Sequence, residues 1–337
     1  MSVQKRVDLM TRNLQEVIGR EELVSIAEKR DLSVYWGTAI TGKPHIAYLV
    51  PLLKIKDFVD AGCRVKILFA DIHGFLDNLK APIEKIKHRC VYYERLIKAC
   101  LRMLCVELEK IEFVRGSEYQ RSPEYVMDLY RILAITNEHD AKKAGAQVVR
   151  QVENPMISSL VYPAMQALDE EHLHVDVQFG GVDQRKIFTY ARKYLPMLGY
   201  AKRIHLMSPM VPGLNSEKMS SSEEVSKIDM MDSSESIMRK MKKSFCEEGN
   251  KENGLLKIFL HIIFPVFCMH DKEVWMEIRG AGRVVFERYE DLEDAFGKRE
   301  VHPMDLKEGA ARMIDEVIGP VRSEMMEQAD VLRQAYD

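Results

Sequence analysis

The sequence predicts an α/β protein: a doubly wound, mostly parallel sheet followed by a mainly helical domain. Two observations support this fold class. Through the first two thirds of the chain, short runs of β-branched and aromatic residues alternate with helix-length stretches, as in βαβ units. From about residue 233 onward, helical patterns follow one another. Because ligands bind at the carboxyl ends of the strands in such sheets, we expect the functional site there.

The individual elements follow from these patterns. Strands are expected at residues 33–38, 65–70, 111–114, 175–179 and 203–207. Helices are expected at 48–61, 83–104, 235–245, 255–264 and 306–318. Pro82 suits the first position of its helix, whereas Pro51 fits the first helix only if it falls within the opening turn.

Composition excludes several classes of protein. The 337 residues are 46% hydrophobic and 30% charged, which is typical of a globular protein, and no apolar run is long enough to span a membrane. The first 20 residues are too charged for a secretory signal peptide. Six scattered cysteines without a Cys-x-x-Cys pair predict reduced thiols and an intracellular, cytoplasmic location. His172 and His174 lack further ligands nearby, so we expect no metal bound by the protein.

Net charge does not indicate a nucleic-acid partner. The formal charge is −3, and the acidic excess lies in residues 229–337. A polyanion would therefore have to bind local basic patches rather than a global positive field.

The first motif is GTAITGKP at residues 37–44, between a predicted strand and a predicted helix. It resembles a P-loop, but Pro44 stands where that motif needs Ser or Thr for magnesium, which disfavours a P-loop NTPase. Two glycines and a following helix start can still meet phosphate. His45 follows directly and could donate to a phosphate oxygen in a transition state.

The second motif is KMSSS at residues 218–222, in a loop after a Pro- and Gly-containing stretch. By composition alone, a lysine among serines indicates only a solvated loop. Together with HIAY at 45–48, however, it resembles the His-Ile-Gly-His and Lys-Met-Ser-Lys-Ser signatures of class I aminoacyl-tRNA synthetases.

Longer stretches narrow the resemblance. The segments YWGTAITGKPHIAYLVP, ILFADIHGFLDN, VDVQFGGVDQRKIF and VHPMDLK resemble tyrosyl-tRNA synthetases of the eukaryotic cytosolic and archaeal type. The resemblance implies a Rossmann-like catalytic domain at 1–228, with a connective dimerisation insertion at about 117–165. It also implies a mainly helical anticodon-binding domain at 229–337.

The resemblance further implies a tyrosine site. Tyr35 and Asp169 match the pair that binds the substrate phenol, and a carboxylate can accept its O–H bond. Tyr162, Gln166 and Gln184 match the residues that hold the substrate ammonium. Gln178 and His73 are expected to line the pocket as well. Tyr162 and Gln166 share one helical face with Asp169 by their spacing. The full set is Tyr35, His73, Tyr162, Gln166, Asp169, Gln178 and Gln184.

ATP and catalytic residues are implied in the same way. The ATP-binding set is Gly37, Thr41, Gly42, His45, Gly180, Gly181, Asp183, Met210, Val211 and Lys218. The catalytic set is His45, Lys218, Ser220 and Ser221. Because Ser221 stands where many relatives have a second lysine, magnesium bound with ATP is expected to carry more of the pyrophosphate charge.

Two residues are implied to contact tRNA: Arg185 at the first base pair of the acceptor stem and Asp305 at the first anticodon base. No aromatic precedes the glycines at 280 and 282 to stack on that base. Trp275 is a candidate for this role, but we expect it to lie in the core instead.

The predicted function is that of a tyrosine–tRNA ligase, which forms tyrosyl-adenylate from L-tyrosine and ATP and transfers it to tRNA(Tyr). The expected assembly is a homodimer with no membrane contact. Two alternatives remain at this point: a tryptophanyl-tRNA synthetase, and a catalytically silent paralogue that binds RNA or a partner protein.

Overall fold

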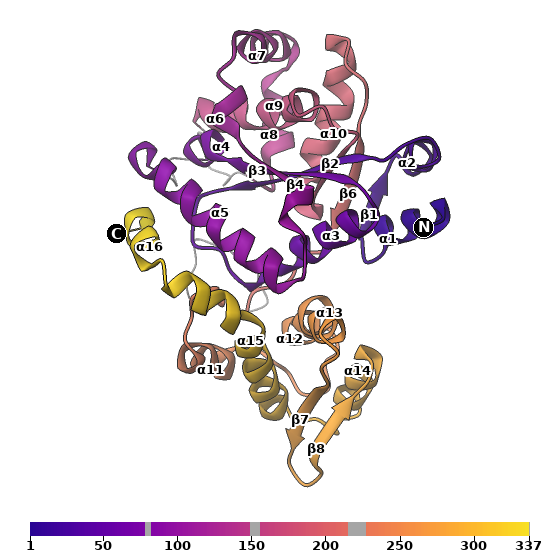
Figure 1. The fold of residues 1–337 in the computed structure, drawn as a ribbon, viewed down its shortest axis with the longest axis vertical. Helices are drawn as coiled ribbons and strands as arrows, with labels where there is room; N and C mark the ends of the chain where they lie inside the picture. The colour runs from indigo at the N-terminus through magenta and orange to yellow at the C-terminus, as the bar shows by residue number, and fades with distance from the viewer. Residues whose placement is uncertain (78–81, 149–155, 215–226, 337) are drawn as a thin grey trace.

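The computed structural model describes residues 1–77, 82–148, 156–214 and 227–336. Figure 1 shows an upper α/β part and a lower, mainly helical part joined at a narrower middle. The predicted fold class is confirmed.

The upper part is built on a six-stranded sheet. Its order is β1-β6-β5-β2-β3-β4, and every neighbouring pair is parallel except β1 with β6. The strands are β1 (Glu16–Ile18), β2 (Ser33–Ala39), β3 (Arg64–Ala70), β4 (Ile111–Arg115), β5 (Val177–Gly181) and β6 (Ile204–Ser208). The prediction missed β1, whose three residues are too few to show an alternating pattern, and began β5 two residues early.

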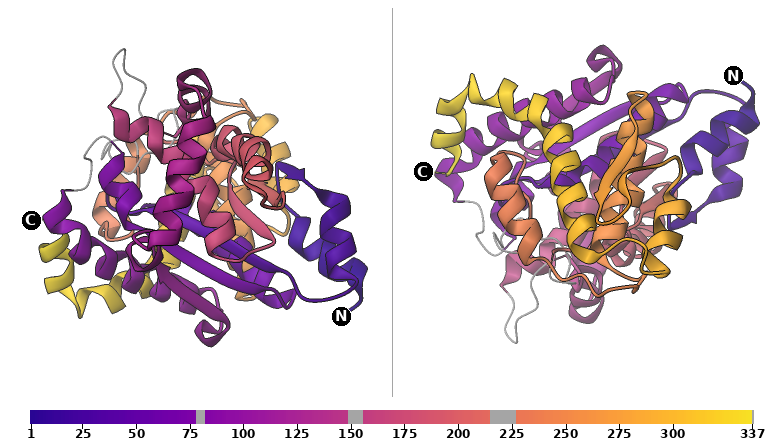
Figure 2. Two further views of the ribbon diagram at one scale, coloured as in Figure 1. Left: turned by 90° about the horizontal axis from the view of Figure 1, so that it is seen from above. Right: turned by 90° about the horizontal axis from the view of Figure 1, so that it is seen from below.

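Helices cover the sheet on both faces (Figure 2). The helices of this part are α1 (Val3–Thr11), α2 (Arg20–Ala27), α3 (Leu49–Asp60), α4 (Asp71–Leu76), α5 (Ile86–Met103), α6 (Gly116–Tyr119), α7 (Pro123–Ile135), α8 (Glu138–Gly145), α9 (Ile157–His172) and α10 (Arg185–Tyr194). Pro51 lies in the first turn of α3, the one place where a helix accepts proline without losing a hydrogen bond, as the prediction required. Pro82 lies just before a 3-10 turn, Ile83–Lys85, and not inside the helix.

Local sequence explains how α7 begins. The Ser122 side chain accepts a hydrogen bond from the Tyr125 N–H at 3.2 Å, and Pro123 occupies the first helical position. The inner face of α7 then buries Tyr125 and Ile132 against α9 and α10, in a cluster separate from the main core. This cluster fixes α7 beside the helix that carries Asp169.

The lower part contains α11 (Ser234–Lys243), α12 (Gly254–Ile258), α13 (Phe264–Met269), α14 (Tyr289–Gly297) and α15 (Pro303–Met326). The last helix, α16 (Ala329–Tyr336), lies back beside α5 of the upper part (Figure 1). A π-helical turn, Phe259–Ile263, joins α12 to α13. The part is mainly helical, as predicted, but it also contains two strands that were not predicted: β7 (Val274–Ile278) and β8 (Gly282–Phe286) form an antiparallel hairpin. Gly280 and Gly282 take positive φ at its turn, which favours glycine.

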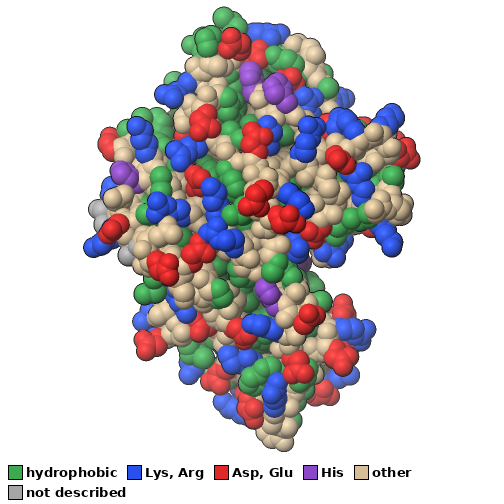
Figure 3. Space-filling view, viewed as in Figure 1, with side chains coloured by type: hydrophobic (Ala, Val, Ile, Leu, Met, Phe, Trp, Pro, Cys, Tyr) green, Lys and Arg blue, Asp and Glu red, His purple; other side chains and the backbone are tan. Residues whose placement is uncertain are grey.

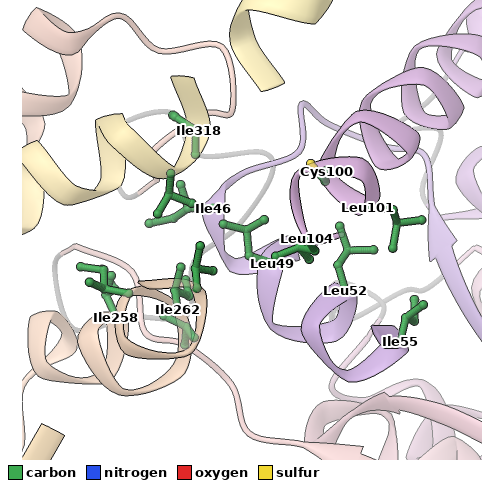
Figure 4. Packing of buried hydrophobic residues seen from close by; sticks show 14 of the residues in the cluster. Ile46, Leu49, Leu52, Ile55, Cys100, Leu101, Leu104, Ile258, Ile262 and Ile318 are labelled. Atoms are coloured by element: carbon green, nitrogen blue, oxygen red, sulfur yellow. The ribbon is translucent and has the colours of Figure 1, made fainter. Parts of the chain in front are cut away.

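The two parts share one hydrophobic core. Figure 4 shows Leu49 of α3 and Leu104, directly after α5, on the side of Ile262 of the π-helical turn, with Ile318 of α15 close by. Each of these side chains is at most 1% exposed. The lower part is therefore packed directly against the helices that support the sheet. Within the described residues, no helix is both long and apolar enough to cross a membrane.

Candidate active site

A cavity of about 370 Å³ opens at the carboxyl ends of β2 and β5. It lies where a doubly wound sheet is expected to bind ligands. Of the residues predicted for tyrosine and ATP, the structure brings together Tyr35, Gly37, Thr41, His45, His73, Tyr162, Gln166, Asp169, Gln178, Gly180, Gly181, Asp183, Gln184, Met210 and Val211. The predicted Lys218, Ser220 and Ser221 lie outside the described residues.

One end of the cavity contains a buried carboxylate, Asp169, which is 1% exposed. Its Oδ1 accepts three hydrogen bonds: from the Tyr119 hydroxyl at 2.8 Å, from Gln120 Nε2 at 2.8 Å and from the Tyr125 hydroxyl at 3.0 Å. Three donors on one oxygen hold the carboxylate in a fixed orientation. Sequence reasoning missed all three, since they lie 44 to 50 residues away and match no motif.

The other oxygen, Asp169 Oδ2, lies 3.9 Å from His73 Nε2. Burial lowers the pKa of His73, although the nearby Asp169 opposes this, so the imidazole is neutral near pH 7. Burial raises the pKa of Asp169 in turn, against the effect of His73 and the three donors. The Tyr35 ring is 1% exposed beside them, and its hydroxyl donates to the Gln166 carbonyl at 3.3 Å.

Amide side chains line the middle of the cavity. Gln166 Nε2 donates to Gln184 Oε1 at 3.0 Å, and the Tyr162 ring packs edge-on against His73 with centroids 4.7 Å apart. Gln178 is 2% exposed, and its Oε1 has no partner within the part of the chain that the structure describes. A buried acceptor of this kind is costly unless a ligand donates to it. An ammonium group would satisfy that requirement.

Two glycines shape the far end of the cavity. A Cβ at Gly181 would lie 2.6 Å from Asp183 Oδ1 and 2.7 Å from Met210 Sδ. A Cβ at Gly180 would lie 3.0 Å from the Phe188 ring. Only glycine therefore allows the carboxylate of Asp183 and the thioether of Met210 to approach this strand end so closely.

The loop at 40–45 forms another wall. His45 is 7% exposed, pairs through a β-bridge with Asp229, and precedes a 3-10 turn, Ile46–Tyr48, that leads into α3. Its ring meets the Tyr48 ring edge-on with centroids 5.3 Å apart. Gly42 does not line the cavity, and its carbonyl accepts hydrogen bonds from the hydroxyls of Tyr93 and Tyr336, which do not line it either.

The two residues predicted for tRNA lie outside the cavity. Arg185, whose side chain is half exposed, forms an ion pair with Glu16 at 2.7 Å. Asp305 lies at the start of α15 and is 4% exposed; it accepts a hydrogen bond from the Arg279 backbone N–H at 3.2 Å. The Arg185 guanidinium and the Asp305 carboxylate are therefore both already paired within the chain.

The expectation that Trp275 lies in the core is wrong. Its side chain is only partly buried, because it alternates with the buried Val274 and Met276 along β7. The guanidinium groups of Arg283 and Arg312 lie 4.6 Å and 3.6 Å from its ring centroid. Cation–π contacts of this kind stabilise an aromatic ring at the surface.

No group of three or more His, Cys, Asp or Glu side chains that could hold a metal ion is found among the residues described. His172 is instead engaged with Asp128, at 3.1 Å between Nε2 and Oδ2.

Comparison with known proteins gives consistent results. Residues 27–319 match the family model of class I tRNA synthetases (W and Y). The chain is 68% identical, over the full length of both, to a probable cytoplasmic tyrosine–tRNA ligase of Encephalitozoon cuniculi. It is 54% identical over 95% of its residues to the cytoplasmic tyrosine–tRNA ligase of Gallus gallus, of whose length it spans 60%. Among solved structures, a tyrosyl-tRNA synthetase of Archaeoglobus fulgidus complexed with L-tyrosine matches with a TM-score of 0.88 and 34% identity, over 96% of this chain and all of that one.

Proposed function

The chain belongs to the class I tRNA synthetases of the tryptophan and tyrosine group, and on that premise we propose that it is a tyrosine–tRNA ligase. The enzyme uses L-tyrosine, ATP and tRNA(Tyr) as substrates. Its relatives carry the word cytoplasmic in their names, and we assign the same location here.

The observation that carries the proposal is that Asp169 and Tyr35, each only 1% exposed, both line the same cavity. A phenol hydroxyl both donates and accepts, so it can donate to the Asp169 carboxylate and accept from the Tyr35 hydroxyl. An indole N–H only donates, which disfavours tryptophan. Phenylalanine has no hydroxyl, so it could neither donate to the Asp169 carboxylate nor accept from the Tyr35 hydroxyl, and both hydrogen bonds with the substrate would be lost.

The first step requires no covalent enzyme intermediate. The tyrosine carboxylate attacks the α-phosphorus of ATP, the bond to the bridging oxygen breaks, and pyrophosphate leaves. The cavity contributes by holding the two substrates in line, with Gln178 and Gln184 at the ammonium and Asp183 at the ribose. His45 lies on the cavity wall, where it can donate to a phosphate oxygen as charge develops.

Magnesium bound with the triphosphate would offset part of its negative charge. We propose that Lys218, Ser220 and Ser221 complete the phosphate site, in keeping with the motif that they form. In the second step, the terminal ribose hydroxyl of tRNA attacks the tyrosyl carbonyl and AMP leaves.

Transfer requires that tRNA reach both parts of the chain. We assign catalysis to residues 1–228 and anticodon recognition to 229–337, with Arg185 and Asp305 as the contacts at the two ends of the tRNA. In Figure 3, Lys and Arg side chains lie scattered among Asp and Glu over the face shown. Local contacts to phosphate, rather than a uniform basic surface, are therefore expected on this face.

The connective segment, about 117–165, offers a surface for a second copy of the chain. Along α7, Met127, Tyr130 and Ile135 are 58%, 61% and 43% exposed, although the opposite face of that helix is buried. Exposed large apolar side chains grouped on one helix are typical of an association surface. We propose that the enzyme forms a homodimer through this face.

The test is tyrosine-dependent ATP–pyrophosphate exchange, run with tyrosine, phenylalanine or tryptophan. We expect exchange with tyrosine alone, and a large loss in Asp169→Ala. Glu171→Ala, two positions further along the same helix and partly exposed, is the control and should keep its activity. Exchange driven by tryptophan would reassign the substrate, and no exchange with any amino acid would leave the catalytically silent paralogue.

A further inference from the structure

Helix α16 packs beside α5. Both helices contact the loop at residues 41–43, although Tyr336 of α16 lies 294 residues after Gly42 in the sequence. Views from above and below both place α16 next to α5 (Figure 2). The Tyr336 ring meets the Tyr92 ring edge-on with centroids 5.4 Å apart, and the Arg89 guanidinium lies 4.9 Å from the Tyr336 centroid. Ala335 is fully buried, and its carbonyl accepts from Arg89 Nε at 3.3 Å. The last turn of α16 is thus firmly packed.

From this position α16 reaches the backbone of the loop. The Tyr336 hydroxyl donates to the Gly42 carbonyl at 2.9 Å, and the Tyr93 hydroxyl of α5 donates to the same oxygen. The carbonyl of the preceding residue, Thr41, accepts from Arg89 Nη1. Two successive carbonyls are therefore held by side chains of α5 and α16.

The next carbonyl is also held. Lys43 O accepts from Lys227 Nζ at 3.1 Å, and the Lys43 ammonium lies 5.6 Å from the Tyr336 ring centroid. Three consecutive peptide planes between Thr41 and Pro44 are thus fixed by donors outside the loop.

Fixing these carbonyls also fixes the direction of the amide N–H groups. The peptides are trans, so each N–H points opposite to the carbonyl of the same peptide unit. The N–H groups of Gly42 and Lys43 must therefore point away from α5 and α16. Gly42 and Lys43 do not line the cavity themselves, but Thr41 and His45, on either side of residues 42–44, do. Amides oriented in this way can meet phosphate oxygens.

We propose that α16 is a positioning element for the ATP-binding loop, acting through the Tyr336 hydroxyl on the Gly42 carbonyl. This inference rests on the proposed function, because it assigns the loop to the phosphates of ATP. Tyr336 does not touch the substrate. It holds the loop in the orientation that binds ATP, together with Tyr93, and so lowers the cost of ordering the loop when ATP binds.

The test is Tyr336→Phe, which removes the hydroxyl and keeps the packed ring. We expect KM for ATP to rise about threefold to tenfold, the effect of one hydrogen bond, with KM for tyrosine and the melting temperature unchanged. Tyr93→Phe should act similarly. The double variant should exceed the product of the two single effects, because the Gly42 carbonyl then loses both donors.

The matched control is Tyr289→Phe, since the Tyr289 hydroxyl also has a side-chain partner, Glu293 at 2.7 Å, but lies in α14 of the lower part. It should leave both KM values unchanged. Binding of ATP with magnesium is also measured by calorimetry, which needs no turnover.

The outcomes separate the inference from the proposed function. If Tyr336→Phe leaves KM for ATP unchanged, or raises both KM values alike with a loss of stability, the positioning role is wrong. If the wild-type protein shows no exchange yet binds ATP more tightly than Tyr336→Phe, the inference holds while the proposed function fails. If the wild-type protein binds no ATP at all, both are overturned.

Discussion

The Tyr119 hydroxyl lies 2.8 Å from Oδ1 of Asp169, and this hydrogen bond links α6 to the carboxylate at the closed end of the cavity. Together with Gln120 and Tyr125, Tyr119 occupies one carboxylate oxygen, and the other oxygen, Oδ2, lies 3.9 Å from His73 Nε2. The orientation of this carboxylate thus depends on three residues that do not line the cavity.

Tyr119→Phe tests this dependence. A hydrogen bond to an ionised group contributes about 1.5–3 kcal/mol, so KM for tyrosine should rise roughly tenfold or more. KM for ATP should stay the same, and the preference for tyrosine over phenylalanine should fall. Tyr190→Phe, which removes a hydroxyl that contacts Thr136 at 2.6 Å, is the control. An equal rise in both KM values would contradict the positioning of Asp169.

Asp169→Asn separates function from stability. Because burial raises the pKa of Asp169, the folded protein holds this proton more tightly than the unfolded chain does. The stability that the proton contributes is fully present below the unfolded pKa and is lost as pH rises through the folded pKa. Asparagine cannot ionise and avoids this loss.

We therefore expect the ligand-free Asp169→Asn variant to melt above the wild-type protein at pH 7, with the difference shrinking toward pH 4, while tyrosine binding is lost. Thermal unfolding across pH measures this. Asp31→Asn, at a side chain that is 62% exposed, should show little change. A lower melting temperature for Asp169→Asn at pH 7 would mean that the ionised carboxylate stabilises the fold.

The next residue of α9, Glu170, forms a buried pair with His205 of β6. Their side chains are fully buried, with Glu170 Oε1 and His205 Nε2 2.7 Å apart, and the Phe188 ring stacks on His205. Glu170→Ala should cost about 1–3 kcal/mol of unfolding free energy, because it leaves the buried His205 imidazole without this hydrogen-bond partner. Glu170→Gln keeps an acceptor oxygen and should cost less.

Urea unfolding measures both variants. Glu171→Ala removes the neighbouring pair, with Arg203 at 2.6 Å, whose side chains are partly exposed, and should cost only about 1 kcal/mol or less. If Glu170→Ala costs no more than Glu171→Ala, the buried pair does not anchor α9 to the sheet.

Gly181→Ala tests the crowding at the nucleotide end of the cavity. The added methyl group would push Asp183 and Met210 away, since both lie within 2.7 Å of its position. We expect KM for ATP to rise several-fold with little loss of stability, because both neighbours are ends of flexible side chains. Gly319→Ala, in α15, is the control: apart from its own helix and its chain neighbours, the added methyl group meets nothing within 4 Å, and KM for ATP should stay unchanged. An unchanged KM for ATP in Gly181→Ala would place the nucleotide elsewhere.

The sequence by itself determined the features that depend on local pattern. The alternation of strands and helices predicted five of the six strands of the main sheet, and helical spacing placed Tyr162, Gln166 and Asp169 on one face of α9. The order of the motifs predicted the family, because each motif is a short run of adjacent residues.

Only the tertiary structure decided which distant residues support that site. Nothing in the spacing of Tyr119 and Tyr125 connects them to Asp169, and nothing in α16 connects Tyr336 to Gly42, 294 residues away. The strand β1 and the hairpin of β7 and β8 were missed because short or partly exposed strands carry a weak periodic signal. Local pattern specifies which face of an element is buried, whereas the hydrogen bonds that orient a site form only when packing brings distant elements together.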